Sequence, residues 1–260
     1  MNATFYKYQG TGNDFVMIDD REGLFPISQD LIASLCHRRY GIGADGLILL
    51  QKADGYDFRM VYFNADGTES TMCGNGGRCL VRFAYDLGIF EKTTVFIAID
   101  GPHEATVNDA LVSLKMSPVS SVEMKADHDF LNTGSPHYVT YVDDIENTAV
   151  FELGRAVRYG EAYGPKGGTN VNFVQVLDTN HLNVRTYERG VEDETYSCGT
   201  GVTASVLSAN LHQGWDGPVT VETLGGTLQV SFQKISDQQF DDIFLIGPAK
   251  FVFKGEVAIS

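Results

Sequence analysis

Two cysteines of this chain stand in matched glycine-rich segments. Cys73 opens the segment Cys-Gly-Asn-Gly-Gly-Arg, and Cys198 opens the segment Cys-Gly-Thr-Gly-Val-Thr. Each segment runs into an apolar stretch that can form a helix, so each thiol is predicted to stand at a helix N-terminus. Unpaired N–H groups and the helix dipole lower the pKa of such a thiol, to roughly 3.5–7.5. Two such thiols can remove a proton from one face of a carbon and return one to the other face.

The α-carbon of an amino acid is a suitable centre for this chemistry. The backbone N–H groups that follow each cysteine, beginning at Gly74 and Gly199, can hold a carboxylate, as helix N-termini do. The two glycines carry no side chain that would block its approach. General acid–base catalysis works best with groups whose pKa lies near the working pH. The pattern therefore predicts inversion at an α-carbon by a thiolate and a thiol, without a cofactor.

The chain also repeats itself at a constant spacing. Cys73 and Cys198 are 125 positions apart, and so are Gly43 and Gly168. A tyrosine stands 11 residues before each of the two cysteines. A shared offset at separate places favours an internal duplication, with the boundary near residues 117–121.

The elements expected around these cysteines are mostly strands. Alternating β-branched and aromatic residues predict strands at residues 58–63, 94–99, 110–114, 182–187 and 251–253. Helices are expected at residues 28–39, 78–87 and 203–212, with Ser28 and Asp30 capping the first and Gly88 and Gly214 ending the others.

This pattern indicates an α+β fold of two similar domains, each a mixed β-sheet wrapped around a central helix, with the active site in the cleft between them. We expect residues 1–117 plus 249–260 to form the half that contains Cys73. Residues 118–248 should form the half that contains Cys198. The last strand would then return to the first half.

Composition limits the possible partners and the compartment. The 260 residues carry a net charge of −15, which argues against nucleic acid or an anionic membrane as the main partner. No run of 18 apolar residues and no N-terminal signal pattern is present, and only four cysteines occur. These features predict a cytoplasmic protein whose thiols are not paired in disulfides. Cys36 and Cys79 are expected to be small buried apolar residues, and no metal site is expected because no C-x-x-C or zinc-spaced histidine pair occurs.

A set of short motifs, which occur in order between residues 10 and 201, resembles the diaminopimelate epimerase family. The motifs are GTGNDF at 10–15, GADG at 43–46, YFNADG at 62–67, CGNGGRC at 73–79, PH at 136–137, NVNF at 170–173, ERG at 188–190 and CGTG at 198–201. The resemblance implies a cofactor-independent enzyme that interconverts LL- and meso-diaminopimelate for lysine and peptidoglycan precursor synthesis. It also implies a homodimer.

The resemblance implies roles for individual residues of this chain. Cys73 and Cys198 become the acid–base pair, and Gly74, Asn75, Gly199 and Thr200 hold the reacting α-carboxylate. The other implied substrate-binding residues are Asn13, Asn64, Asn170, Glu188 and Arg189, with Arg189 gripping the distal carboxylate, and the implied pKa-tuning residues are His137 and Glu188.

The chain departs from the family pattern at four places. Many members have Asn where this chain has Ser135, and some have Gln where Gly46 stands. The loop at residues 189–197 is one residue longer and more acidic, and Phe253 replaces a tyrosine at a dimer contact of some members. The sequence does not decide which cysteine rests as the thiolate.

The sequence alone allows three other interpretations, and the two intact cysteine segments argue against one of them, a non-enzymatic binding protein of the same fold. A proline or hydroxyproline racemase shares the expected fold and the two cysteines, but it would not need Glu188 and Arg189 or three pocket asparagines. A thiol redox protein that uses Cys73 and Cys198 would tolerate changes at Arg189 and Asn64.

Overall fold

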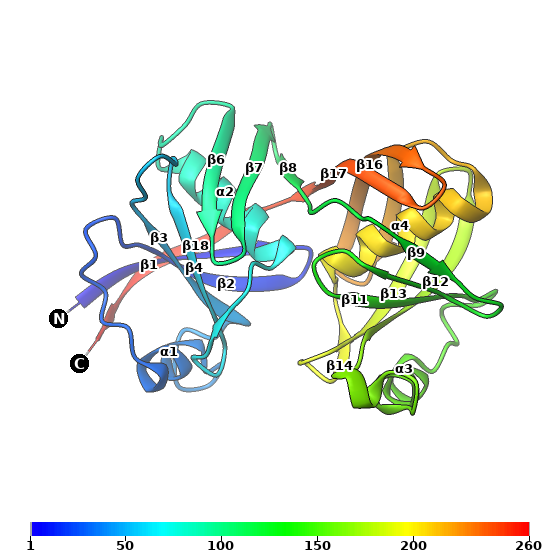
Figure 1. Cartoon of the computed structure of the whole chain (residues 1–260). Helices are drawn as coiled ribbons and strands as arrows, with labels where there is room; N and C mark the ends of the chain where they lie inside the picture. Colours follow the sequence, from blue (N-terminus) through cyan, green and yellow to red (C-terminus); the bar gives the residue numbers. More distant parts are fainter. Residues whose placement is uncertain (1, 260) are drawn as a thin grey trace. The chain divides into compact units, whose positions relative to one another are not determined.

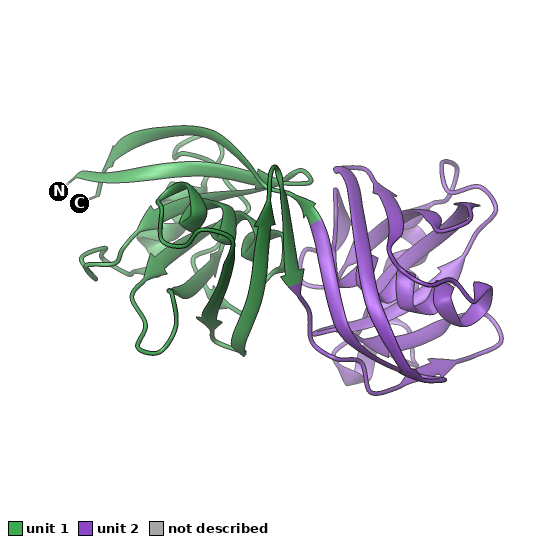
Figure 2. Ribbon diagram, turned by 90° about the horizontal axis from the view of Figure 1, so that it is seen from above, with its two compact units in different colours: residues 1–114, 247–260 green, residues 115–246 purple. Residues whose placement is uncertain are grey.

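The computed structural model describes residues 2–259, and it divides the chain into two compact units (Figure 2). Unit 1 comprises Met1–Leu114 with Gly247–Ser260, and unit 2 comprises Lys115–Ile246. The boundaries expected from the sequence lie slightly further along the chain, after residue 117 and before residue 249. Among the described residues, no helix combines the length and the apolar character needed to cross a membrane.

Unit 1 is a mixed sheet with two helices (Figure 1). Its elements are β1 (Asn2–Gly10), β2 (Asn13–Asp19), α1 (Gln29–Cys36), β3 (Gly46–Gln51), β4 (Arg59–Asn64), β5 (Glu69–Ser70), α2 (Gly74–Asp86), β6 (Thr93–Ala98), β7 (Gly101–Asn108), β8 (Leu111–Lys115) and β18 (Lys250–Ala258). The strands pair in the order β18-β1-β2-β3-β4-β6-β7-β8, and β2–β3 and β4–β6 are the parallel pairs. Helix α2 contacts β1, β2, β3, β4, β7 and β18, so the sheet wraps around it.

Unit 2 is built in the same way. Its elements are β9 (Val122–Met124), β10 (Asp129–Asn132), β11 (Pro136–Tyr141), α3 (Val150–Tyr159), the 3-10 helix η1 (Gly164–Lys166), β12 (Asn170–Asp178), β13 (His181–Glu188), β14 (Asp193–Thr195), α4 (Gly199–Gln213), β15 (Val219–Thr223), β16 (Gly226–Ser236) and β17 (Gln239–Pro248). The strands pair in the order β9-β10-β11-β12-β13-β15-β16-β17, and β11–β12 and β13–β15 are the parallel pairs. Helix α4 contacts β10, β11, β12, β13, β15 and β16.

The two units therefore repeat one order of strands, one order of helices and one pattern of parallel and antiparallel pairs. Gly43 and Gly168, which share the 125-residue offset, both have positive φ, at 81° and 74°. The α+β fold of two similar domains, each a mixed sheet around a central helix, is thus confirmed.

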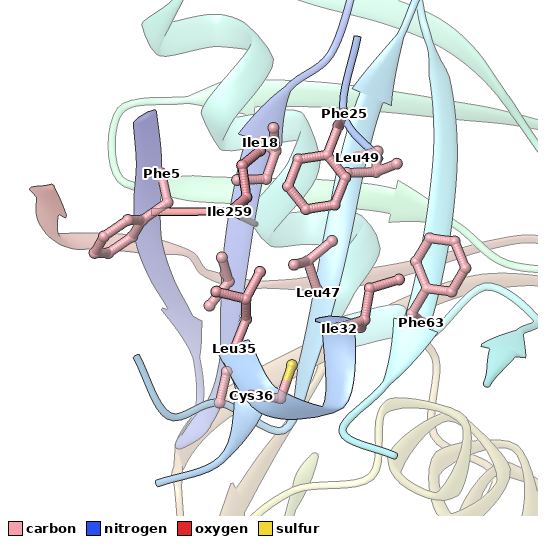
Figure 3. Close-up of a cluster of buried hydrophobic side chains, with 12 residues drawn as sticks. Phe5, Ile18, Phe25, Ile32, Leu35, Cys36, Leu47, Leu49, Phe63 and Ile259 are labelled. Carbon is pink, nitrogen blue, oxygen red and sulfur yellow. The ribbon is translucent and has the colours of Figure 1, made fainter. Parts of the chain in front are cut away.

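Both faces of the central strands of unit 1 are covered, which explains their continuous apolar sequence. Phe15, Val16, Met17 and Ile18 of β2 are at most 4% exposed. On one face α2 covers the sheet. On the other face a cluster packs under α1, with Ile18 among its members (Figure 3).

Most of the expected elements occur, with shifted ends. Ser28 caps α1 by accepting the N–H of Leu31 at 3.3 Å, and Gly214 ends α4 in the left-handed conformation. The two cysteine-led helices begin four residues earlier than expected, at Gly74 and Gly199, because their glycines belong to the first turn.

One α-helix was missed, as was the short 3-10 helix η1. Helix α3 contains Gly154, whose low helix propensity concealed it. A Cβ on Gly154 would overlap the Tyr187 side chain, so glycine lets α3 pack directly on β13.

Candidate active site

Cys73 is the N-cap residue of α2. Its backbone is extended (φ −101°, ψ 129°), and its carbonyl accepts the N–H of Gly77 at 2.7 Å. The side chain makes no capping bond. The thiol therefore stands beside the first-turn N–H groups, where the helix dipole favours a negative charge.

The asparagine pair around Cys73 has a defined orientation. Asn13 Nδ2 donates to Asp45 Oδ2 at 2.6 Å, so Asn13 Oδ1 faces the other way. That oxygen lies 3.8 Å from Cys73 Sγ and accepts from Asn75 Nδ2 at 3.4 Å. The structure thus brings Asn13 and Asn75 together with Cys73, and the group beside the sulfur is an acceptor.

An ion cluster around the buried Lys7 supports this arrangement. Lys7, only 5% exposed, contacts Asp14 at 2.7 Å and also donates to the carbonyl of Gly43. Arg38 bridges Asp14 and Asp45 at 2.7 Å each. Burial alone would raise the pKa of Asp14, but Arg38 and Lys7 outweigh it and lower the pKa to about 2. Asp45, which holds Asn13, is thereby fixed to the sheet.

Arg78 is a second buried cation of unit 1, with no exposed surface. Its guanidinium donates to Asn75 Oδ1 at 2.9 Å, to Thr11 Oγ1 at 3.3 Å and to the carbonyl of Gly74 at 3.4 Å. Burial lowers the pKa of Arg78, and the neighbouring thiols of Cys79 and Cys73 oppose that shift. Arg78 ties the first turn of α2 to the turn between β1 and β2.

Asn64 is placed by strand register. It ends β4 directly opposite Gly46 of β3. A Cβ on Gly46 would lie 2.5 Å from the carbonyl oxygen of Phe63 and 2.6 Å from the Tyr62 ring. No side chain fits at position 46 without a shift of its neighbours.

Cys198 occupies the matched position before α4. Its backbone is extended (φ −111°, ψ 107°), its carbonyl accepts the N–H of Val202 at 2.8 Å, and it is 7% exposed. Cys198 Sγ lies 3.5 Å from Thr200 Oγ1. This sulfur therefore has a hydroxyl beside it.

His137 of β11 is completely buried, and Ser135 links it to the Thr200 hydroxyl. Burial lowers the pKa of His137 to about 3, and the charge of Arg189 acts in the same direction. Nδ1 of His137 lies 3.1 Å from Asn172 Nδ2, and Nε2 lies 2.9 Å from Ser135 Oγ. The imidazole is therefore neutral near neutral pH.

Asn170 links two further site residues. Its Oδ1 accepts the backbone N–H of Arg189 at 2.8 Å, and its Nδ2 donates to Ser135 Oγ at 3.2 Å. The Arg189 residue is exposed, so its guanidinium is accessible to a ligand. Glu188 Oε2 accepts from Thr195 Oγ1 at 2.9 Å. Within unit 2 the structure brings Cys198, Thr200, His137 and Asn170 into one network, and Asn170 connects it to Arg189.

Sequence reasoning missed several supporting residues. Asp45, Arg78 and Asn172 were not assigned roles, although each lies inside one of the quoted motifs. Buried polar residues in such motifs are the signal that could have found them. Cys36 and Cys79 are buried as expected, and burial raises their pKa values to about 11 and about 12.

Over residues 2–259, no three His, Cys, Asp or Glu side chains are grouped closely enough to hold a metal ion. The arrangement offers a thiol at each of two helix N-termini, with oriented amides and hydroxyls around them. Groups of these kinds can transfer protons and bind an anion.

Solved structures share the fold of this chain. A PhzF-family phenazine biosynthesis protein from Bacillus anthracis aligns over 100% of both chains with a TM-score of 0.78 at 15% identity. A probable proline racemase from Agrobacterium radiobacter aligns with a TM-score of 0.70 at 15% identity, over 99% of this chain and 93% of that one. The chain has the two-domain fold of these proteins.

Sequence comparison is more specific. The diaminopimelate epimerase family model matches residues 5–122 and 130–252. The diaminopimelate epimerase of Flavobacterium psychrophilum is 51% identical over 252 residues, covering 96% of this chain and 98% of the relative. That of Chlorobaculum tepidum is 42% identical over 260 residues, covering 96% and 99%. This chain belongs to the diaminopimelate epimerase family, a family of isomerases.

Proposed function

We propose that this protein interconverts LL- and meso-diaminopimelate by inverting one α-carbon, in the synthesis of lysine and peptidoglycan precursors. The observation that carries the proposal is the pair of thiols in equivalent N-cap positions, Cys73 before α2 and Cys198 before α4. Family membership supports diaminopimelate as the substrate, because the family and the relatives are named diaminopimelate epimerase.

In the proposed mechanism, the thiolate of one cysteine removes the α-proton and the thiol of the other delivers a proton to the opposite face. The C–H bond breaks with its electron pair left on carbon, the carboxylate takes up charge as an enediolate, and the new C–H bond forms with inversion. Backbone N–H groups at Gly74–Asn75 and Gly199–Thr200 stabilise that developing charge. Each turnover leaves the two sulfurs with exchanged protonation.

The distal end of the substrate is assigned to unit 2. Arg189 is exposed and its backbone is held by Asn170, so its planar guanidinium can bind the distal carboxylate through two hydrogen bonds. Asn13 and Asn64 of unit 1 are proposed as further substrate-binding residues, and Glu188 is proposed to lie near the reacting amine. A proline or hydroxyproline racemase has no use for this distal site, because its substrate has no second amino-acid end.

The test is proton exchange in deuterium oxide without added cofactor. We expect the purified protein to exchange the α-hydrogen of diaminopimelate, followed by NMR. Cys73→Ala and Cys198→Ala should each lower the inversion rate by about 10³-fold or more, because each removes one proton-transfer group. Cys36→Ala, a buried thiol outside the proposed pair, is the control and should retain turnover. Exchange on proline but not on diaminopimelate would refute the substrate assignment, and normal turnover by Cys198→Ala would refute the two-thiol mechanism.

We further propose that the protein acts as a homodimer. Three consecutive apolar residues of β18, Phe251, Val252 and Phe253, are 49%, 52% and 44% exposed. A run of this kind on one strand is typical of a surface that a partner covers. A second copy of the chain is the partner we propose.

A further inference from the structure

A continuous series of hydrogen bonds in unit 2 joins His137 to the sulfur of Cys198. His137 Nε2 lies 2.9 Å from Ser135 Oγ, and Ser135 Oγ lies 3.2 Å from Thr200 Oγ1. Thr200 Oγ1 in turn lies 3.5 Å from Cys198 Sγ. The direction of each bond follows from the groups at the buried end.

The buried end is fixed by Asn172, which has no exposed surface. Its Oδ1 accepts from Thr186 Oγ1 at 2.9 Å, and its Nδ2 donates to the carbonyl of Tyr138 at 2.9 Å. These two bonds fix the orientation of the Asn172 amide. Nδ2 therefore donates its second hydrogen to His137 Nδ1, at 3.1 Å. Nδ1 must be an acceptor, so the single ring proton of neutral His137 is on Nε2.

The middle of the series has only one arrangement of hydrogens. Ser135 Oγ accepts from His137 Nε2 and also from Asn170 Nδ2 at 3.2 Å. With both lone pairs used, the one hydroxyl hydrogen of Ser135 is left for Thr200 Oγ1. Thr200 is then the acceptor in that bond and has its own hydrogen to give.

We propose that Ser135 and Thr200 are positioning residues. Neutral His137 fixes the direction of the Ser135 hydroxyl, Ser135 fixes that of the Thr200 hydroxyl, and Thr200 thereby donates a hydrogen bond to the Cys198 sulfur. A hydrogen bond donated to sulfur stabilises the thiolate over the thiol. Ser135 and the Thr200 side chain thereby gain a role in proton transfer that is separate from holding the substrate. The inference rests on the proposed function, because it specifies how Cys198 is prepared for that reaction.

The Cys73 sulfur of unit 1 has a different neighbour. The residue that matches Thr200 is Asn75, and the group beside the Cys73 sulfur is Asn13 Oδ1, which can only accept. Arg78 is the buried cation on the helix of Cys73, whereas Thr203 stands at that position of α4. The two thiols are therefore tuned by different groups.

Two ionisable residues, Glu188 and Arg189, follow Tyr187 of β13, which pairs with Val171 beside Asn170. Glu188 accepts from Thr195, and Arg189 lowers the pKa of His137 through its charge. Neither is changed in the test below, so both act equally in all variants compared.

The test is the pH profile of Cys198 alkylation by iodoacetamide in the full-length protein without substrate, resolved by mass spectrometry of each cysteine peptide. Thr200→Val should slow Cys198 alkylation at neutral pH by about tenfold and move its midpoint to higher pH, because a hydrogen bond to the thiolate is lost. Ser135→Ala should have the same direction with a smaller effect. Thr200→Ser should restore the wild-type profile, because the hydroxyl returns.

Matched controls lie on the same helix. Thr203 donates its hydroxyl to the carbonyl of Gly199 and Ser205 to that of Gly201, both outside the series. Thr203→Val and Ser205→Ala should leave the Cys198 profile unchanged. Cys73 in the same samples reports any general disturbance, and its profile should not move in any variant.

The result separates this inference from the proposed function. An unchanged pH profile of Cys198 alkylation in Thr200→Val would refute the proposed role of the hydrogen-bond series, even if Cys198→Ala abolishes turnover. An equal shift of the Cys73 profile would refute it as well. A shifted profile in Thr200→Val with normal turnover by Cys198→Ala would support the series and refute the catalytic role of Cys198. Thiolate ultraviolet absorbance in a Cys73→Ala background gives the same reading should alkylation be slow.

Discussion

At the scale of single residues, the asparagine beside Cys73 is oriented by a carboxylate. Asn13 faces Cys73 because Asp45 holds its amide nitrogen, and Asp45 is held by Arg38 together with Asp14. Asp14 also neutralises the buried Lys7. Loss of Asp14 would leave Lys7 as an uncompensated buried charge, which is strongly destabilising.

A pH dependence of stability follows from Asp14. Its folded pKa of about 2 lies below the unfolded value of about 3.9, so the carboxylate stabilises the fold above pH 4 and loses this contribution as the pH falls toward 2. The contribution is roughly 2–3 kcal/mol, at 1.36 kcal/mol per pKa unit. We therefore expect Asp14→Asn to lower the free energy of unfolding near neutral pH, and the difference from wild type to shrink between about pH 4 and pH 2. Urea unfolding at several pH values measures it, with exposed Asp54→Asn as the control; a difference that stays constant with pH contradicts the assignment.

Much of the candidate site at this scale was visible in the sequence. The two cysteines and Asn13, Asn75, Asn170 and Thr200 all lie in short motifs, and the structure connects each of these residues to Cys73 or Cys198. The direction of the hydrogen bonds was not visible, because it depends on Asn172 and Thr186. These two residues lie far from Cys198 in sequence and are brought to it by pairing of β11, β12 and β13.

At the scale of elements, helices α2 and α4 start alike but pack on different surroundings. A Cβ on Gly201 of α4 would overlap Asn172 Oδ1 and lie 3.3 Å from Thr186 Oγ1. A Cβ on Gly76, the matched residue of α2, would meet the ends of flexible side chains, Ile48 Cδ1 at 3.1 Å and Met60 Cε at 3.5 Å. Glycine is therefore required in α4 by a fixed amide, whereas in α2 the neighbours can move.

This difference makes a matched pair of variants informative. Gly201→Ala should destabilise the protein by roughly 1–3 kcal/mol through overpacking, and it should displace Asn172 from His137. Gly76→Ala should change stability by less than about 1 kcal/mol, because better helix propensity offsets mild crowding. Thermal and urea unfolding of the two variants measure the difference. Equal effects of the two substitutions would show that Asn172 is free to move away from α4.

The elements were only partly predictable for physical reasons. Strands with a regular alternation or a continuous apolar run were found near their true places. Helix α3 was not, because Gly154 lowers local helix propensity and the compensating contact with Tyr187 is tertiary. The duplication was the available signal, since α1 of unit 1 has its counterpart in α3.

At the scale of the whole molecule, the last strand belongs to the first unit. Strand β18 pairs antiparallel with β1, from Asn2 opposite Ala258 to Gln9 opposite Lys250, and Ile259 lies in the cluster under α1. The sequence predicted this return from an apolar run alone. It did not predict that the run would remain so exposed, because exposure depends on what covers the strand.

The exposed run of β18 leads to a prediction about assembly. Phe253 has an edge-to-face contact with Phe5 at 5.8 Å, and yet it remains 44% exposed. If a second copy covers it, light scattering should give twice the 28.5 kDa of the single chain. Phe253→Lys should then shift the protein toward the single-chain mass, because the partner would have to bury an unpaired charge.

Leu177→Lys is the matched control for that variant. Leu177 of β12 is 45% exposed, nearly the same as Phe253, but it lies in unit 2. The control should keep the doubled mass, since a lysine at an uncovered site remains solvated. A single-chain mass for the wild-type protein at micromolar concentration would refute the homodimer. A doubled mass for Phe253→Lys would place the interface on a surface other than β18.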